Sequence, residues 1–221
     1  MVDFILVIGN RSSSSWSLRG WLALKQAGVD FDEERVWFKR PDIREQILAH
    51  SPSGLVPVLK HGATVVWETL AIIEYLAELF PQAGLWPDDA IARAHARTIS
   101  AEMHGGFSAL RNHMPMDLQN EFPEQGQGDN MEAGVGQNIQ RISAIWDDCR
   151  NRFGAGGDFL FGAGFCAADI MFAPVVTRFQ TYGVELSPVC RAYADAVLET
   201  PLMREWTKGA RAELPPGEAQ A

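Results

Sequence analysis

The sequence lacks any cluster of basic residues. Its 221 residues include 19 lysines and arginines against 28 aspartates and glutamates, which gives a formal net charge of −9. Nucleic acids attract proteins through clustered positive charge, so this balance excludes a non-specific phosphate-binding surface. We therefore expect no nucleic-acid partner.

Long hydrophobic runs are also missing. The apolar stretch 4–8 is far shorter than the roughly 20 residues that a membrane-spanning helix needs. It also lacks the basic flank and the small-residue cleavage site of a signal peptide. We expect no membrane contact, and the composition of 47% hydrophobic and 21% charged residues is typical of globular proteins.

Cysteine is scarce and widely spaced. The three cysteines are Cys149, Cys166 and Cys190, and no two of them form a C-x-x-C pair. This spacing favours neither a zinc site nor a dithiol redox site. We expect no metal and interpret the cysteines as reduced thiols of a cytoplasmic protein.

Strand and helix signals alternate over residues 1–81. Strands are expected at 3–8, 31–38, 56–59 and 64–66, and amphipathic helices at 16–27, 42–49 and 69–79. A His61-Gly62 turn joins the last two strands as a hairpin, so at least one strand pair is antiparallel. The order β-α-β-α-β-β-α predicts a small mixed sheet with helices on both sides.

The pattern changes after a Pro- and Gly-containing linker at 82–87. Residues 88–212 carry only helical signals, including segments at 132–153, 167–182, 188–198 and 201–212. One apolar stripe is expected on a helix over 91–114, formed by Ile99, Met103, Phe107, Leu110 and Met114. We expect a polar turn or a mobile loop at 126–130 and a frayed tail at 213–221.

Val56-Pro57 begins the third predicted strand. Proline cannot donate to a strand ladder, so it lies at the beginning or the edge of a strand. A cis bond at Pro57 would turn the backbone N–H and C=O of Val56 toward an extended peptide ligand, as in strand addition. The alternative is an ordinary trans proline, since only about 5–6% of X-Pro bonds are cis.

Glu68-Thr69 lies directly after the hairpin and opens a predicted helix. Thr69 is expected at the N-cap, where free N–H groups favour a carboxylate, and Glu68 can meet an ammonium group. A ligand with an α-amino acid end would then be held at both charges. The alternative is that Thr69 only caps the helix while Glu68 is solvated.

Four consecutive serines, Ser12, Ser13, Ser14 and Ser15, separate the first strand from the first helix. A hydroxyl there can donate to a thiolate, and the helix start adds positive potential. Together these effects would lower a thiol pKa by about one to three units. The alternative is a serine turn that caps the helix.

A fourth set of candidates lies on the predicted helix 91–114. His104 shares one helical face with Ser108 and Arg111, which suggests a substrate pocket at the interface between the two domains. A lone histidine on a helix is more often structural.

Together these segments resemble the glutathione S-transferase superfamily. The resemblance rests on Ser-Ser-Trp-Ser-Leu-Arg at 14–19, Ser-Pro-Ser-Gly-Leu-Val-Pro-Val-Leu at 51–59, Glu-Thr at 68–69 and Ala-Ala-Asp at 167–169. It implies an α/β thioredoxin-like N-terminal domain at 1–81 that binds glutathione through Leu55, Val56, Pro57, Glu68 and Thr69. It also implies an all-α C-terminal domain at 88–212 that supplies the substrate pocket, and a homodimer.

The resemblance leaves the catalytic serine open. The chain looks most like bacterial serine-type members, and segment 12–19 is similar to the zeta class, which includes maleylacetoacetate isomerases. Alignment on Leu18 places Ser12 at the catalytic serine, whereas closer bacterial relatives keep the pair that matches Ser14-Ser15. Leu55 stands where relatives often carry lysine or glutamine, so one contact to glutathione is expected to be missing.

Three functions follow from this resemblance. The first is a glutathione transferase that activates the thiolate of glutathione, its co-substrate, for attack on a small hydrophobic electrophile. The second is a glutathione-dependent cis-trans isomerase, and the third is a binding protein with little catalysis, because a fold does not fix a function.

Overall fold

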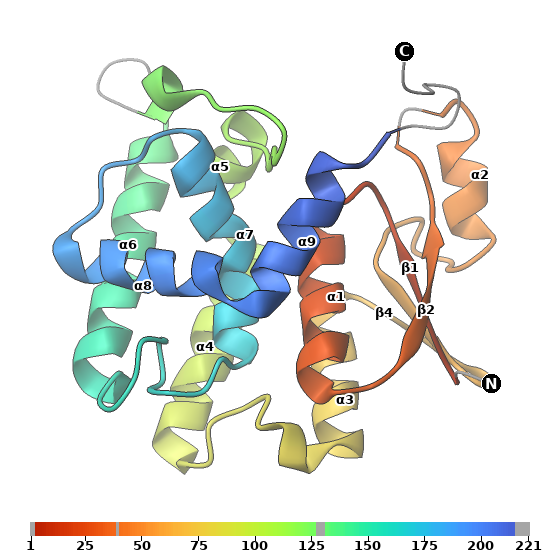
Figure 1. The fold of residues 1–221 in the computed structure, drawn as a ribbon, viewed down its shortest axis with the longest axis horizontal. Coiled ribbons are helices and arrows are strands. Elements are labelled where there is room, and N and C mark those ends of the chain that lie inside the picture. The colour runs from red at the N-terminus through yellow and green to blue at the C-terminus, as the bar shows by residue number, and fades with distance from the viewer. Residues whose placement is uncertain (1–2, 39, 127–130, 215–221) are drawn as a thin grey trace.

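The chain forms a mixed sheet with flanking helices, followed by a bundle of helices (Figure 1). The computed structural model describes residues 3–38, 40–126 and 131–214. The strands are β1 (Phe4–Ile8), β2 (Phe31–Arg35), β3 (Val58–His61) and β4 (Thr64–Trp67), in the order β2-β1-β3-β4. β1 is parallel to β2 and antiparallel to β3, which is antiparallel to β4, as the hairpin signal predicts.

Helices cover both faces of this sheet. They are α1 (Ser15–Ala27), α2 (Ile43–Leu48) and α3 (Thr69–Leu79). Side chains alternate along β1, so Leu6 and Ile8 join the large core with α1 and α3, while Val7 packs with Ile47 of α2. This arrangement confirms the predicted thioredoxin-like fold class. The strand predicted at 31–38 is shorter than expected, because β2 ends with its partner β1 at the pair Ile8–Arg35.

The second half of the chain is helical. Its helices are α4 (Ala90–Gly105), α5 (Ser108–His113), α6 (Val135–Phe153), α7 (Ala167–Thr181), α8 (Pro188–Glu199) and α9 (Pro201–Arg211), with short 3₁₀ turns at Pro81–Ala83 and Pro123–Gly126. Nearly every residue of α7 is buried, since this helix packs against α1, α4 and α8. In Figure 1, α9 returns from the bundle to lie beside α1.

The single helix predicted over 91–114 is wrong. α4 ends at Gly105, and Phe107 adopts a left-handed backbone (φ 60°) before α5 begins. A Cβ at Gly106 would lie 2.7 Å from the carbonyl oxygen of Glu102, so the chain turns at a position that only glycine fits. The five residues of the predicted stripe are nevertheless all buried.

The C-terminal segment also departs from expectation. Glu213, predicted to begin a frayed tail, is only 6% exposed and its carboxylate accepts hydrogen bonds from the loop after β1. Residues 215–221 of that tail and residues 127–130 of the predicted polar turn lie outside the described residues.

Among the residues described, no helix has the length and apolar character needed to span a membrane.

Candidate functional site

A cavity of about 170 Å³ lies between the sheet domain and α4. It is lined by Trp16, Leu55, Val56, Pro57, Glu68, Thr69 and His104. All five residues predicted to bind glutathione therefore line one cavity, together with one of the three predicted pocket residues. Trp16 also lines the cavity, although it was not among the predicted site residues.

Val56 presents its backbone at this cavity. The Val56-Pro57 peptide bond is cis, as hypothesised, and Val56 lies before the first paired residue of β3. Within the described part of the chain, neither the N–H nor the C=O of Val56 has a hydrogen-bond partner. Pro57 packs so closely under α1 that a Cβ on Gly20 would lie 2.9 Å from Pro57 Cγ. An extended peptide could therefore pair with Val56 as an added strand does.

Glu68 stands in an unusual backbone conformation at the start of α3. Its φ is 70° and its ψ 123°, a region that costs a non-glycine residue about 1–3 kcal/mol and recurs at binding sites. The carboxylate lies 3.4 Å from His104 Nε2. Glu68 rather than Thr69 occupies the N-cap, so the predicted capping role of Thr69 is wrong. The buried Thr69 hydroxyl has no hydrogen-bond partner among the described residues.

The four serines have different environments. Ser12 Oγ donates to the Glu213 carboxylate at 2.9 Å, and Ser13 is exposed. Ser14 is the N-cap of α1: its Oγ accepts from Ser17 N–H and donates to Ser17 Oγ at 2.7 Å. Ser15 Oγ accepts from Arg178 Nη2 at 3.2 Å. Among the three serines with a hydrogen-bonded side chain, only Ser15 keeps its hydroxyl proton without an acceptor in the described structure.

The start of α1 is strongly electropositive. The N–H groups of Ser15 and Trp16 have no acceptor among the described residues, as expected for the first turn of a helix. Arg178 on α7 is 3% exposed, and burial, followed by the charge of Arg111, lowers its pKa to about 10. These donors and charges favour an anion beside Ser15.

Arg19 adds a second buried cation. Its guanidinium lies 4.4 Å from the Trp16 ring centroid, and Nε donates to the Met171 carbonyl at 2.8 Å. Burial lowers the pKa of Arg19 well below its usual value, and the charges of Arg178 and Arg111 lower it further. In the described structure no carboxylate forms an ion pair with any of these three arginines. Arg19 and Arg178 are buried, and a buried charge without a counter-ion is costly.

His104 does not share a helical face with Ser108 and Arg111, because the chain turns at Gly106 between α4 and α5. Arg111 on α5 reaches back and donates to the carbonyls of Met103 and His104, with its guanidinium 5.8 Å from the Trp16 ring centroid. His104 makes an edge contact with the same ring at 5.1 Å. Ser108 is exposed and does not line the cavity.

The three cysteines lie away from this cavity and are buried. Burial raises the pKa of Cys149 to about 12 and that of Cys190 to about 11, and it raises the pKa of Cys166 as well. In residues 3–38, 40–126 and 131–214, no group of three or more His, Cys, Asp or Glu side chains could hold a metal ion.

These raised pKa values predict unreactive thiols, because the thiolate is the nucleophile. A pKa of 11 leaves only about 0.1% of a thiol ionised at pH 8. Ellman's reagent should therefore titrate none of the three cysteines rapidly in the native protein and all three after unfolding in guanidinium. Rapid reaction of one native thiol would show that its surroundings are more open or more polar than described.

Family models and curated relatives identify the protein family to which the chain belongs. The family model of the glutathione S-transferase N-terminal domain matches residues 13–79, and that of the C-terminal domain matches residues 88–208. The chain is 30% identical over 178 residues to a probable maleylacetoacetate isomerase of Caenorhabditis elegans, across 80% of this chain and 79% of that protein.

Solved structures show the same fold. A bacterial zeta-class maleylpyruvate isomerase superposes with a TM-score of 0.73 at 24% identity, covering 97% of this chain and 100% of that chain. A glutathione transferase homologue from Burkholderia, with bound glutathione, gives a TM-score of 0.70 at 23% identity over 95% and 98% of the two chains. The predicted family is thus confirmed: this chain belongs to the glutathione S-transferase family.

Proposed function

We propose that this protein binds glutathione as a co-substrate and supports its thiolate for attack on a small hydrophobic electrophile. The observation that carries the proposal is the cavity where Val56, Glu68 and Thr69 meet. The free N–H and C=O of Val56 suit the backbone of the cysteinyl residue. The start of α3 with the unpaired Thr69 hydroxyl suits the γ-glutamyl carboxylate, and Glu68 suits the ammonium group.

Leu55 provides no polar side-chain contact to glutathione in the proposed site. It is 60% exposed at the rim, and because its N–H donates to Ser53 Oγ, it offers only its carbonyl for a polar contact. The proposed binding of glutathione therefore depends on Val56, Glu68 and Thr69.

The proposed thiolate site lies at the start of α1. Ser15 would donate its free hydroxyl proton to the sulfur, while Arg178 donates to Ser15 Oγ and makes that hydroxyl a stronger donor. Ser12 and Ser14 are less suited, because both already donate to other side chains.

A second function is favoured by three arginines near the start of α1. Arg19 and Arg111 contact the Trp16 ring and Arg178 contacts Ser15, and none of them pairs with a described carboxylate, which suits a substrate that carries carboxylate groups. The similar C. elegans protein is named a probable maleylacetoacetate isomerase. In such a reaction the thiolate adds to a cis double bond, the resulting single bond rotates, and elimination returns glutathione with the trans product. His104, Arg111 and Trp16 would line the path to the sulfur.

Two further proposals concern the oligomeric state of the protein and its cellular compartment. Val65 and Trp67, each 40% exposed, lie on the edge strand β4, and an exposed apolar edge supports the proposed homodimer. The three free cysteines support a reducing compartment, and we propose the cytoplasm.

One experiment separates these functions. The purified protein is tested for thermal stabilisation by glutathione, then for conjugation of a chlorodinitrobenzene and for isomerisation of a maleyl diketo acid. Conjugation supports the transferase. Turnover of the diketo acid alone supports the isomerase, and the Arg178→Met variant should then lose this isomerase activity. Binding without turnover would leave only a binding protein. No stabilisation by glutathione at millimolar concentration would contradict both enzymatic proposals.

A further inference from the structure

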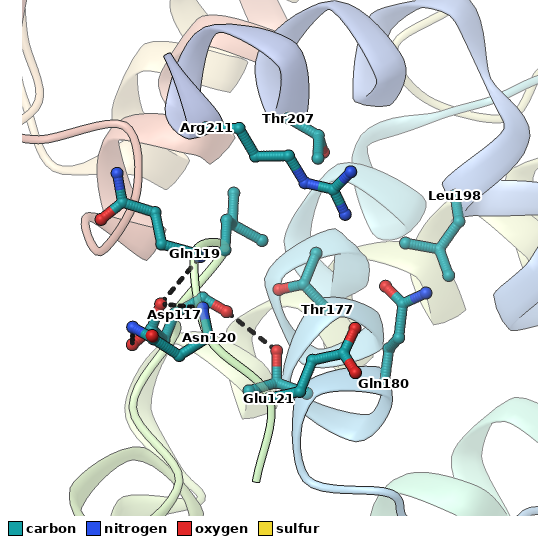
Figure 2. A pocket seen from close by; sticks show the side chains of 11 residues that line it. Asp117, Gln119, Asn120, Glu121, Thr177, Gln180, Leu198, Thr207 and Arg211 are labelled. Atoms are coloured by element: carbon teal, nitrogen blue, oxygen red, sulfur yellow. Dashed lines mark hydrogen bonds between the residues drawn. The ribbon is translucent and has the colours of Figure 1, made fainter. Parts of the chain in front are cut away.

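A second and larger cavity lies in the helical half of the chain. Its volume is about 410 Å³, and it is lined by segment 117–121 and by residues of helices α7, α8 and α9 (Figure 2). None of its lining residues belongs to the proposed glutathione site. The volume lies within the range of small-molecule sites, about 300–1,000 Å³.

Two opposite charges in this cavity are unpaired. Arg211 reaches into it from the end of α9, and Glu121 faces it from the loop below (Figure 2). Neither side chain forms an ion pair or hydrogen bond with another described residue. Each charge is therefore free to meet a group of a ligand.

Neutral groups at the same cavity are also unused. The side chains of Gln180 and Thr207 have no hydrogen-bond partner among the residues described, whereas Thr177 and Thr181 already donate to the carbonyls of Pro174 and Asp117. Leu118 and Leu198 supply apolar surface. The unused set is thus one cation, one anion, an amide and a hydroxyl.

The wall formed by segment 117–121 is fixed by hydrogen bonds. Leu118 N–H donates to the Ser12 carbonyl, and Gln119 Nε2 donates to the carbonyl of Ala210 at 3.0 Å. Asp117 accepts from the N–H groups of Gln119 and Asn120, which closes the turn. A wall that is ordered before binding lowers the entropic cost of taking up a ligand.

We propose that this cavity binds a small zwitterion, either an α-amino acid or a short peptide. Its carboxylate would pair with Arg211, which can form two parallel hydrogen bonds, and its ammonium group with Glu121. Gln180 and Thr207 would bind the intervening amide, and an apolar side chain would lie on Leu118 and Leu198. A neutral or singly charged ligand would leave one of the two charges without a partner.

Calorimetric titration of the full protein tests this site with glycylglycine and L-glutamine as probes. The peptide or the amino acid should bind saturably at millimolar concentration or below. Arg211→Gln and Glu121→Gln should each weaken the binding about tenfold, the loss of one exposed charge-assisted contact. Lys208→Gln, on the same helix but outside the cavity lining, should leave it unchanged.

Capped probes give a second readout. N-acetylglycylglycine and glycylglycinamide each lack one charge, and each should bind about tenfold more weakly than glycylglycine. The transferase assay, run in parallel, should be unaffected by Arg211→Gln, so failure of this site is distinguishable from failure of the proposed function. The proposal would be overturned if neither probe gave a saturable binding signal. It would also be overturned if the two variants and the two capped probes bound as tightly as the unchanged protein and glycylglycine do.

Discussion

Replacing Ser15 with alanine is expected to lower kcat/KM for glutathione conjugation by about 10- to 100-fold. The variant would remove the proposed charge-assisted hydrogen bond to the thiolate, a kind of contact that contributes about 1.5–3 kcal/mol. The pKa of the bound thiol should rise by about one to two units, because each unit corresponds to 1.36 kcal/mol. The thiolate absorbance near 240 nm, followed against pH with glutathione bound, measures this shift.

The neighbouring serines serve as controls for Ser15. Ser13→Ala, at an exposed position of the same loop, should leave both the rate and the thiol pKa unchanged. Ser14→Ala removes the N-cap of α1 and should mainly cost stability, about 0.5–2 kcal/mol. If Ser13→Ala or Ser12→Ala raised the thiol pKa while Ser15→Ala did not, the assignment of Ser15 would be wrong.

Replacing Glu213 with alanine is expected to destabilise the protein by about 2–4 kcal/mol. The carboxylate accepts hydrogen bonds from Arg11 N–H, Ser12 N–H and Ser12 Oγ, and it lies 3.3 Å from an Arg35 nitrogen. Truncation would leave two partly buried N–H groups without an acceptor in the loop that leads to α1. The midpoint of thermal unfolding should fall by roughly 5–12 °C for a chain of this length.

A matched control distinguishes this role from a general loss of charge. Glu205 on α9 is also a glutamate near the C-terminus, and among the described residues its one ion pair, with Lys25, is well exposed. Glu205→Ala should therefore change stability by less than about 1 kcal/mol. Glu213→Gln keeps one acceptor oxygen and should give an intermediate effect. Equal melting temperatures for Glu213→Ala and Glu205→Ala would contradict the role given to Glu213.

Periodicity predicted most of the fold. The strand and helix order of the first domain follows from apolar alternation, and the helix at Thr69–Leu79 has the predicted bounds. The break between α4 and α5 was not predicted, because the apolar spacing continues across Gly105-Gly106. The signal was present in the paired glycines, one of which lies too close to the Glu102 carbonyl to carry a side chain.

The candidate site was predictable where its chemistry is local. The residues of each pair, Val56-Pro57 and Glu68-Thr69, are adjacent in sequence, and each pair lines the cavity. The choice among the four serines was not predictable, since the partners of Ser12 and Ser15 lie far along the chain. Ser12 is engaged by Glu213 and Ser15 by Arg178, and no local pattern connects residues separated by more than 160 positions.

The most direct measurement is a crystal structure with glutathione bound. The account predicts that the cysteinyl backbone pairs with Val56, that the γ-glutamyl end meets Glu68 and Thr69, and that the sulfur lies within hydrogen-bond distance of Ser15 Oγ. Glutathione bound elsewhere, or with its γ-glutamyl end turned away from Glu68, would contradict it.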